Sequence, residues 1–253
     1  MGLNSKIKSL IFAGCSIVTI GTLAGFSASR QNEKVCKKVS INIGNEYNNY
    51  FIGDKEIKAL LTREGERGLE GLPNKSIDLK NLEKRIESHK FVADADVYRD
   101  LQGNIKVEVK QNRPIARVIQ ANQDVYVDVE GHILPLSDRY TARVIPITRS
   151  ANLKPLNQEF FQDSTGQAYL SLLQFIENDQ FWKAQLAQMH IDGKGKVSFL
   201  PQVGDHTIEF GKPVNLEQKF RKLMIFYKEV LPVMGWDKYK RVNVEYEEQI
   251  ICE

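Results

Sequence analysis

The chain has 253 residues, of which 42% are hydrophobic and 26% charged, so it can build one or two packed domains and is not globally disordered. Its 35 basic and 32 acidic side chains leave a net charge of +3, without the clustered cations of a nucleic-acid surface. Three cysteines, Cys15, Cys36 and Cys252, are too few for a disulfide framework. We expect free thiols.

The first element is an uncharged stretch from Ser9 to Ser29, almost all of it apolar or small up to Phe26. A helix over this stretch is about 30 Å long, which matches the thickness of a bilayer core. We therefore expect a short tail over residues 1–9 and one transmembrane helix over residues 10–29, which would anchor the protein in a membrane.

A cleaved signal peptide is the alternative interpretation of this stretch. Lys6 and Lys8 give it a positive start, and Ser27-Ala28-Ser29 offers small residues for cleavage. More lysine and arginine residues follow the stretch than precede it, so flanking charge alone favours an extracytoplasmic N-terminus. Large downstream domains are often translocated regardless of this charge, so the charge pattern does not settle the orientation.

The first folded region reads as strand, helix, helix, strand, strand. Period-two alternation predicts a strand over 39–43, an extended segment over 93–99 and a strand over 105–109. Asp54 and Asp78 are candidate N-caps of the two helices. The inner faces of these helices carry apolar residues at helical spacing: Ile57, Leu60 and Leu61 in the first, and Leu79, Leu82 and Ile86 in the second.

A second region begins near Asn112 and mixes strands with helices, so the fold class is α+β. Strands are predicted over 125–129, 133–134, 144–147, 190–200 as a hairpin, 207–210 and 241–252. Helices are predicted over 166–177 and from Leu216 onward. The second of these is capped by Asn215 with Gln218 and stops at Pro232.

Residues that resemble reactive groups have simpler explanations. The four histidines show no metal-ligand spacing, and Gly193-Lys194-Gly195-Lys196 lacks the spacing of a phosphate loop. Asp94, Asp96 and Asp100 read as a solvated strand face, while Asp128 and Glu130 are expected on the outer face of a hairpin. We therefore expect no catalytic site, no metal, no cofactor and no small-molecule substrate.

The predicted last strand is a candidate for partner binding. If it is an edge strand, its unpaired backbone groups can accept a strand of another chain, with Tyr246 as an anchor. The candidate partner-binding residues are Val244, Tyr246, Glu247 and Glu248. The alternative, which the sequence favours equally, is that Tyr246 packs into its own domain and that the acidic residues block the edge.

Over nearly its full length, from the N-terminal span through the strand-helix-helix-strand-strand region to the last residues, the chain resembles the FtsQ/DivIB family of bacterial cell-division proteins. The segment 107–116, VEVKQNRPIA, is similar to the family's link between a POTRA domain and a β domain. Residues 126–131, YVDVEG, resemble its hairpin, and residues 242–246, VNVEY, its last strand. The resemblance implies a POTRA domain of βααββ order over 35–111. It also implies a β domain over 112–253 with a mixed sheet and a C-terminal helix and strand.

The same resemblance implies a non-enzymatic scaffold of the divisome in the inner membrane at the septum, with a cytoplasmic N-terminus and a periplasmic bulk. Its C-terminal strand would receive a strand of an FtsB-like partner that comes with an FtsL-like protein, and Tyr246, Glu247 and Glu248 would lie in that contact. The alternative is a POTRA-containing envelope transport or secretion component that handles substrate strands at a sheet edge. Localisation in dividing cells distinguishes the two functions, because a division protein gathers at midcell and a transport component spreads around the envelope.

Overall fold

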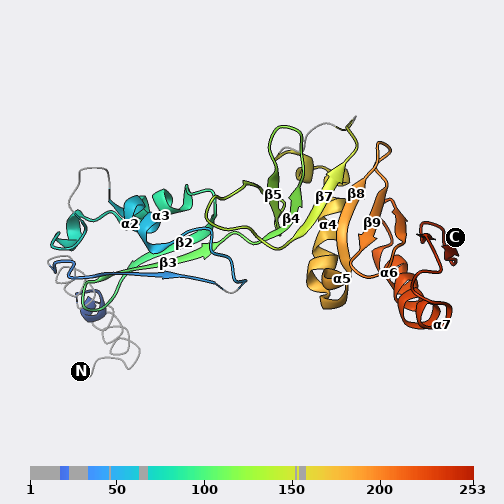
Figure 1. Cartoon of the computed structure of the whole chain (residues 1–253). Coiled ribbons are helices and arrows are strands. Elements are labelled where there is room, and N and C mark those ends of the chain that lie inside the picture. The colour runs from blue at the N-terminus through green and yellow to red at the C-terminus, as the bar shows by residue number, and fades with distance from the viewer. Residues whose placement is uncertain (1–17, 23–33, 46, 63–67, 152, 154–157) are drawn as a thin grey trace, which may run out of the picture. The chain divides into compact units, whose positions relative to one another are not determined.

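The structure is a computed structural model that describes residues 18–22, 34–45, 47–62, 68–151, 153 and 158–253 (Figure 1). The chain forms two compact units that divide between Gln111 and Asn112. The predicted transmembrane helix over 10–29 lies mostly outside the described residues, and its described part, 18–22, is helical. None of the helices in the described ranges is both long and apolar enough to cross a bilayer.

The first unit has the predicted order of strand, helix, helix, strand, strand. Its central strand pairs in parallel with the first strand and antiparallel with the other, which gives the sheet order β1-β3-β2. The elements are β1 (Val39–Ile43), α2 (Asp54–Leu61), α3 (Leu79–Glu87), β2 (Val92–Arg99) and β3 (Ile105–Gln111).

The two helices of this unit begin with different caps. Asp78 accepts a hydrogen bond from the backbone N–H of Asn81, so the predicted cap of α3 is confirmed. The predicted cap of α2 is wrong, because Gly53 holds that position and Asp54 is already helical. The carboxylate of Glu56, the third residue of the helix, accepts the N–H of Gly53 at 2.6 Å, which is the return half of a capping box.

The second unit is built on a mixed sheet of nine strands in the order β12-β11-β10-β9-β8-β7-β4-β5-β6. Three neighbouring pairs are parallel, namely β4 with β7, β7 with β8, and β10 with β11. The strands are β4 (Pro114–Val118), β5 (Val125–Asp128), β6 (Ile133–Pro135), β7 (Ile145–Arg149), β8 (Leu186–Ile191), β9 (Val197–Pro201), β10 (Thr207–Gly211), β11 (Arg241–Asn243) and β12 (Ile251–Cys252). Strand β4, at the start of this unit, is not among the strands predicted from the sequence.

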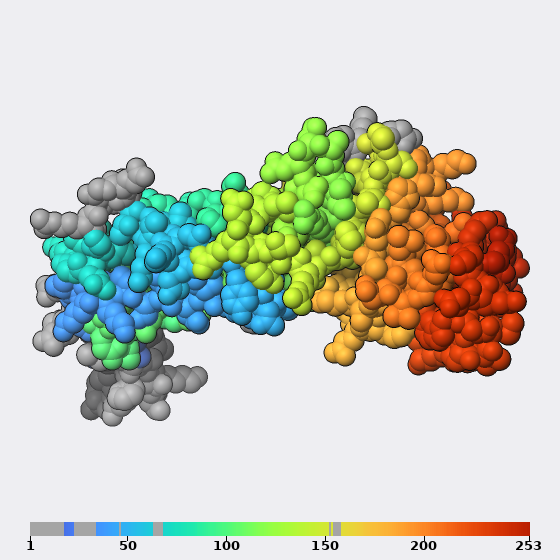
Figure 2. All heavy atoms as spheres, viewed as in Figure 1, coloured from blue at the N-terminus to red at the C-terminus, as the bar shows by residue number. Residues whose placement is uncertain are grey.

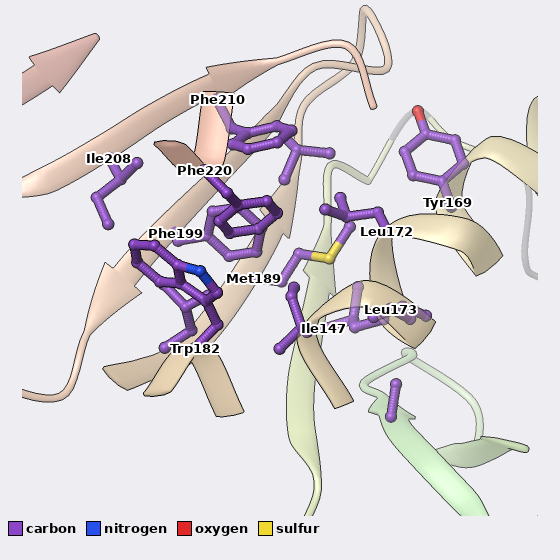
Figure 3. Close-up of a cluster of buried hydrophobic side chains, with 14 of the residues drawn as sticks. Ile147, Tyr169, Leu172, Leu173, Trp182, Met189, Phe199, Ile208, Phe210 and Phe220 are labelled. Atoms are coloured by element: carbon purple, nitrogen blue, oxygen red, sulfur yellow. The ribbon is translucent and has the colours of Figure 1, made fainter. Parts of the chain in front are cut away.

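Helices α4 (Ser164–Asn178), α5 (Gln180–Gln185) and α6 (Leu216–Ile225) pack on this sheet through one apolar core. Trp182 of α5 and Phe220 of α6, both labelled in Figure 3, have ring centroids 4.9 Å apart, and the ring of Phe210 lies 5.1 Å from that of Phe220 and 5.5 Å from that of Phe199 in the sheet. Leu172 of α4 and Met189 of β8 belong to the same core. The helical region between the strands β7 and β8 therefore supplies the core, and it explains why strands β7 and β8 can be parallel neighbours.

The last helix differs from its prediction at both ends. Asn215 has a positive φ of 52° and its side chain forms no capping hydrogen bond, so the predicted cap is wrong. The helix also does not stop at Pro232. It continues through a π-helical turn over Phe226–Val230 into α7 (Leu231–Met234), where Pro232 lies in the first turn and needs no N–H partner.

The hairpin of β5 and β6 differs from its prediction at one residue. Glu130 is exposed as expected, but Asp128 is buried. Its carboxylate accepts the backbone N–H groups of Glu130 and His132 and contacts the ring of His132 at 3.0 Å. Asp128 therefore holds the turn together, which is a structural role.

Candidate partner-binding edge

The predicted strand over 241–252 is wrong, because the chain turns back on itself. Strand β11 ends at Asn243, whose side-chain oxygen accepts the N–H of Glu245 at 2.9 Å and starts a turn. Glu248 has a positive φ of 57°, which strand geometry does not allow. Strand β12 then pairs antiparallel with β11. The sheet therefore ends at β12, and β11 is an inner strand.

The four predicted partner-binding residues are divided by this turn. Val244 is fully buried, and its N–H donates to the carbonyl oxygen of Glu209 on β10. Tyr246 is 51% exposed, and Glu247 and Glu248 are exposed as well. The structure thus places Val244 in the core and gathers the other three on the surface of the loop that joins β11 to β12, which we call the terminal loop (residues 244–250).

Lys222 of α6 stabilises the terminal loop through hydrogen bonds to its backbone. Its ammonium group donates to the carbonyl oxygen of Val244 at 2.8 Å, to that of Tyr246, and to that of Gln249 at 3.3 Å. Burial lowers the pKa of Lys222, while the nearby Glu247 acts in the opposite direction. One cation therefore fixes the backbone on which the exposed Tyr246 is carried. Nothing in the sequence around Lys222 signals this contact.

A second set of contacts holds the base of the terminal loop. Lys196, in the turn between β8 and β9, pairs with the carboxylate of Glu245 at 2.8 Å, and this hydrogen bond raises the pKa of Lys196. The side chain of Glu245 lies so close to Gly211 that a Cβ atom there would be 2.6 Å from Cγ of Glu245. Figure 2 shows the residues after α6, in red, as a continuous surface at one end of the second unit.

The outer edge of β12 carries the backbone groups of Cys252. Arg241 and Glu253 exchange both backbone hydrogen bonds at 3.0 Å, so they form a hydrogen-bonded antiparallel pair. The next pair, Val242 and Cys252, is then of the non-hydrogen-bonded kind, in which the N–H and C=O of each residue point away from the partner strand. The groups of Cys252 therefore face outward, where a further strand would lie.

The two edges of the first unit are each met by a carboxylate. The N–H of Val39 on β1 donates to Glu70, and the N–H of Val97 on β2 donates to Glu83 of α3, both at 3.3 Å. An incoming strand at either position would have to displace a glutamate that already accepts the edge N–H. The edge of β12 has no such cover at Cys252 among the described residues.

The acidic and glycine-rich segments singled out in the sequence form turns that are closed by side-chain hydrogen bonds. Asp192 accepts the backbone N–H groups of Lys194 and Lys196, which makes Gly193–Lys196 a hairpin turn. Asp100 likewise closes the turn before β3 by accepting from Asn104. Within the described ranges, no three histidine, cysteine or acidic side chains are grouped to hold a metal ion.

Two family models match the chain. Residues 34–110 match a POTRA-like domain, and residues 113–253 match the model described as FtsQ/DivIB, C-terminal related. A comparison with curated proteins finds no match. The two matched segments meet close to the division between the two compact units, and the second includes the whole nine-stranded sheet.

Proposed function

Because the chain belongs to the FtsQ/DivIB family of cell-division proteins, we propose that it is a scaffold of the divisome that binds a partner membrane protein by strand addition at β12. The family is non-enzymatic, and the role consists of holding other proteins together. Residues 10–29 would anchor the chain in the inner membrane with a cytoplasmic N-terminus, and the two units would act in the periplasm at the septum.

The outward-facing backbone of Cys252 is the observation on which this proposal depends. A partner strand would pair with β12, and the main-chain hydrogen bonds would supply affinity. The two-residue length of β12 keeps this edge short, which limits unwanted pairing when no partner is bound. The partner would be an FtsB-like protein accompanied by an FtsL-like protein.

The terminal loop would supply specificity. Tyr246 is half exposed and amphipathic, so it suits the centre of an interface, and Glu247 and Glu248 add negative charge beside it. Val244 would contribute indirectly, because its buried side chain and its hydrogen bond to Glu209 fix the start of the loop. The glutamates at the edges of the first unit favour β12 over β1 or β2 as the docking strand.

The proposal is tested by replacing the outward N–H of Cys252. Cys252→Pro removes that donor and leaves the Arg241–Glu253 pair intact, whereas Cys252→Ser keeps the N–H and serves as the matched control. We expect Cys252→Pro to lose capture of the FtsB-like partner and Cys252→Ser to retain it, with both variants folded by circular dichroism. Equal capture by both folded variants would exclude strand addition at β12.

A further inference from the structure

The nine-stranded sheet is open between β7 and β8 at the end where both strands begin. Strand β7 starts at Ile145 and β8 at Leu186, yet the ladder between them begins only with the pair Ile147 and Met189. Before this pair, β7 is bonded to β4 alone and β8 to β9 alone. Two strand edges therefore face each other across a gap inside the sheet.

Two features of the sequence keep these edges apart. Pro146 has no N–H, so it cannot donate to β8 where the next rung of the ladder would be. The pairing of β8 with β9 shifts between Leu186 and Gln188, which marks a bulge at Ala187 on the opposite side of the gap. The backbone of Val144, just before β7, forms no hydrogen bond to any other residue that the structure describes.

The gap contains a cavity of about 240 Å³. This volume is below the roughly 300–1,000 Å³ of typical small-molecule sites, so it suits one or two residues of an extended chain better than a cofactor. We call this cavity the β7–β8 slot. It is lined by Ile115, Arg143, Val144, Ile145, Pro146, Ile176, Glu177, Lys183, Ala184, Leu186, Ala187 and Gln202.

The charges at the slot favour an anion. The carboxylate of Glu177 is bonded to Arg113 at 2.9 Å and to Lys183 at 2.6 Å, so its negative charge is balanced by two cations. Arg143, which lines the slot, is exposed and has no ion pair with any described residue. One guanidinium group therefore remains available beside unpaired strand edges.

We propose that the β7–β8 slot binds a short extended segment of a partner polypeptide that carries acidic side chains. The backbone of this segment pairs with the open edge around Val144, and an acidic side chain meets Arg143. The slot is distinct from the edge of β12, so the two sites accept different segments, of one partner or of two.

The test uses the full chain in detergent micelles and fluorescein-labelled hexapeptides in which valine alternates with glutamate, glutamine or lysine. Fluorescence anisotropy should show the glutamate peptide binding about tenfold more tightly than the glutamine peptide, as expected of charge-assisted hydrogen bonds. Arg143→Glu should remove this preference. Lys194→Glu makes the same charge change on an exposed hairpin turn away from the slot and should leave it unchanged.

Two further variants separate this proposal from strand addition at β12. Ala184→Trp fills the slot without changing its charge and should abolish binding of the glutamate peptide. Cys252→Pro should leave that binding unchanged. The slot proposal is wrong if the glutamate and glutamine peptides bind equally, or if the folded Arg143→Glu and Ala184→Trp variants bind as the parent does. Loss of binding in Cys252→Pro would assign the peptide to β12 instead.

Discussion

The ammonium nitrogen of Lys222 lies 2.8 Å from the carbonyl oxygen of Val244, at the point where β11 ends and the terminal loop begins. The same group reaches the carbonyl oxygens of Tyr246 and Gln249 farther along the loop. Helix α6 therefore determines where the chain leaves the sheet and where β12 returns to it. The geometry of the proposed docking edge depends on a residue more than twenty positions earlier in the sequence.

Lys222→Met should loosen the terminal loop without unfolding the protein. The variant keeps the aliphatic stem but leaves three carbonyl oxygens without their donor, at a site where water can partly replace it. We expect faster hydrogen exchange over residues 244–250 and about tenfold weaker capture of the FtsB-like partner. Lys228→Met on the same helical segment is exposed and serves as the control. Equal exchange in the two variants would show that Lys222 does not order the loop.

Lys219→Met should reduce stability rather than binding. The buried ammonium group of Lys219 donates to the carbonyl oxygens of Phe210 and Lys212 at 2.9 and 2.7 Å, and it lies 4.8 Å from the ring centroid of Phe210. Burial lowers the pKa of this lysine, but its replacement removes the donor to the carbonyl oxygen of Phe210, whereas that of Lys212 still accepts the N–H of Val214 at 2.8 Å. We expect a loss of about 1–3 kcal/mol in the free energy of unfolding, measured in urea. The exposed Lys212→Met should change it by less than about 0.5 kcal/mol.

Gly211→Ala should disturb both the fold and the terminal loop. Gly211 has a φ of +75°, and a methyl group there would press on Glu245 and separate it from Lys196. Gly235→Ala is a matched control, because its φ is +99° but no atom lies within 4 Å of the added Cβ. In both variants, backbone strain should lower the free energy of unfolding by about 1–2 kcal/mol. Only Gly211→Ala should also weaken partner capture, and equal capture by the two would contradict the role of Glu245.

Much of the framework follows from local patterns in the sequence. Alternation in 105–109 and the cap at Asp78 describe β3 and α3 correctly, because both reflect short-range physics: one buried sheet face and one satisfied helix terminus. The helix over 166–177 is likewise set by apolar spacing, and the structure extends it only to Ser164–Asn178.

The candidate site is where the sequence reading fails. Val242, Val244 and Tyr246 alternate as in a strand, but Val244 is buried and Tyr246 exposed because the chain turns after Asn243. This turn is stabilised by Lys222 and Lys196, which are distant in sequence and leave no local signal. The continuation of the last helix past Pro232 also depends on tertiary packing, since Leu231 and Phe226 are fully buried.

The stability of the second unit should fall as the pH drops below about 6.5, and His206 should cause part of this loss. His206 is buried, its Nε2 lies 2.9 Å from the hydroxyl of Tyr227, and its Nδ1 has no partner among the described residues. Burial lowers its pKa, and the neighbouring Asp205 only partly opposes this. Burial also raises the pKa of Tyr227 to about 12, so Tyr227 stays neutral in this range.

The loss of stability at lower pH follows from the difference in proton binding between the folded and the unfolded chain. The pKa of His206 is lower in the folded than in the unfolded chain, so the unfolded chain takes up the proton first and is favoured as the pH falls, until the folded pKa is passed. Urea unfolding followed by tryptophan fluorescence from pH 8 to 5 measures this, because Trp182 and Trp236 both lie in the second unit. His206→Phe, which keeps an aromatic ring against Phe226, should reduce the dependence of the free energy of unfolding on pH. An unchanged slope in this variant would assign the acid sensitivity to other groups.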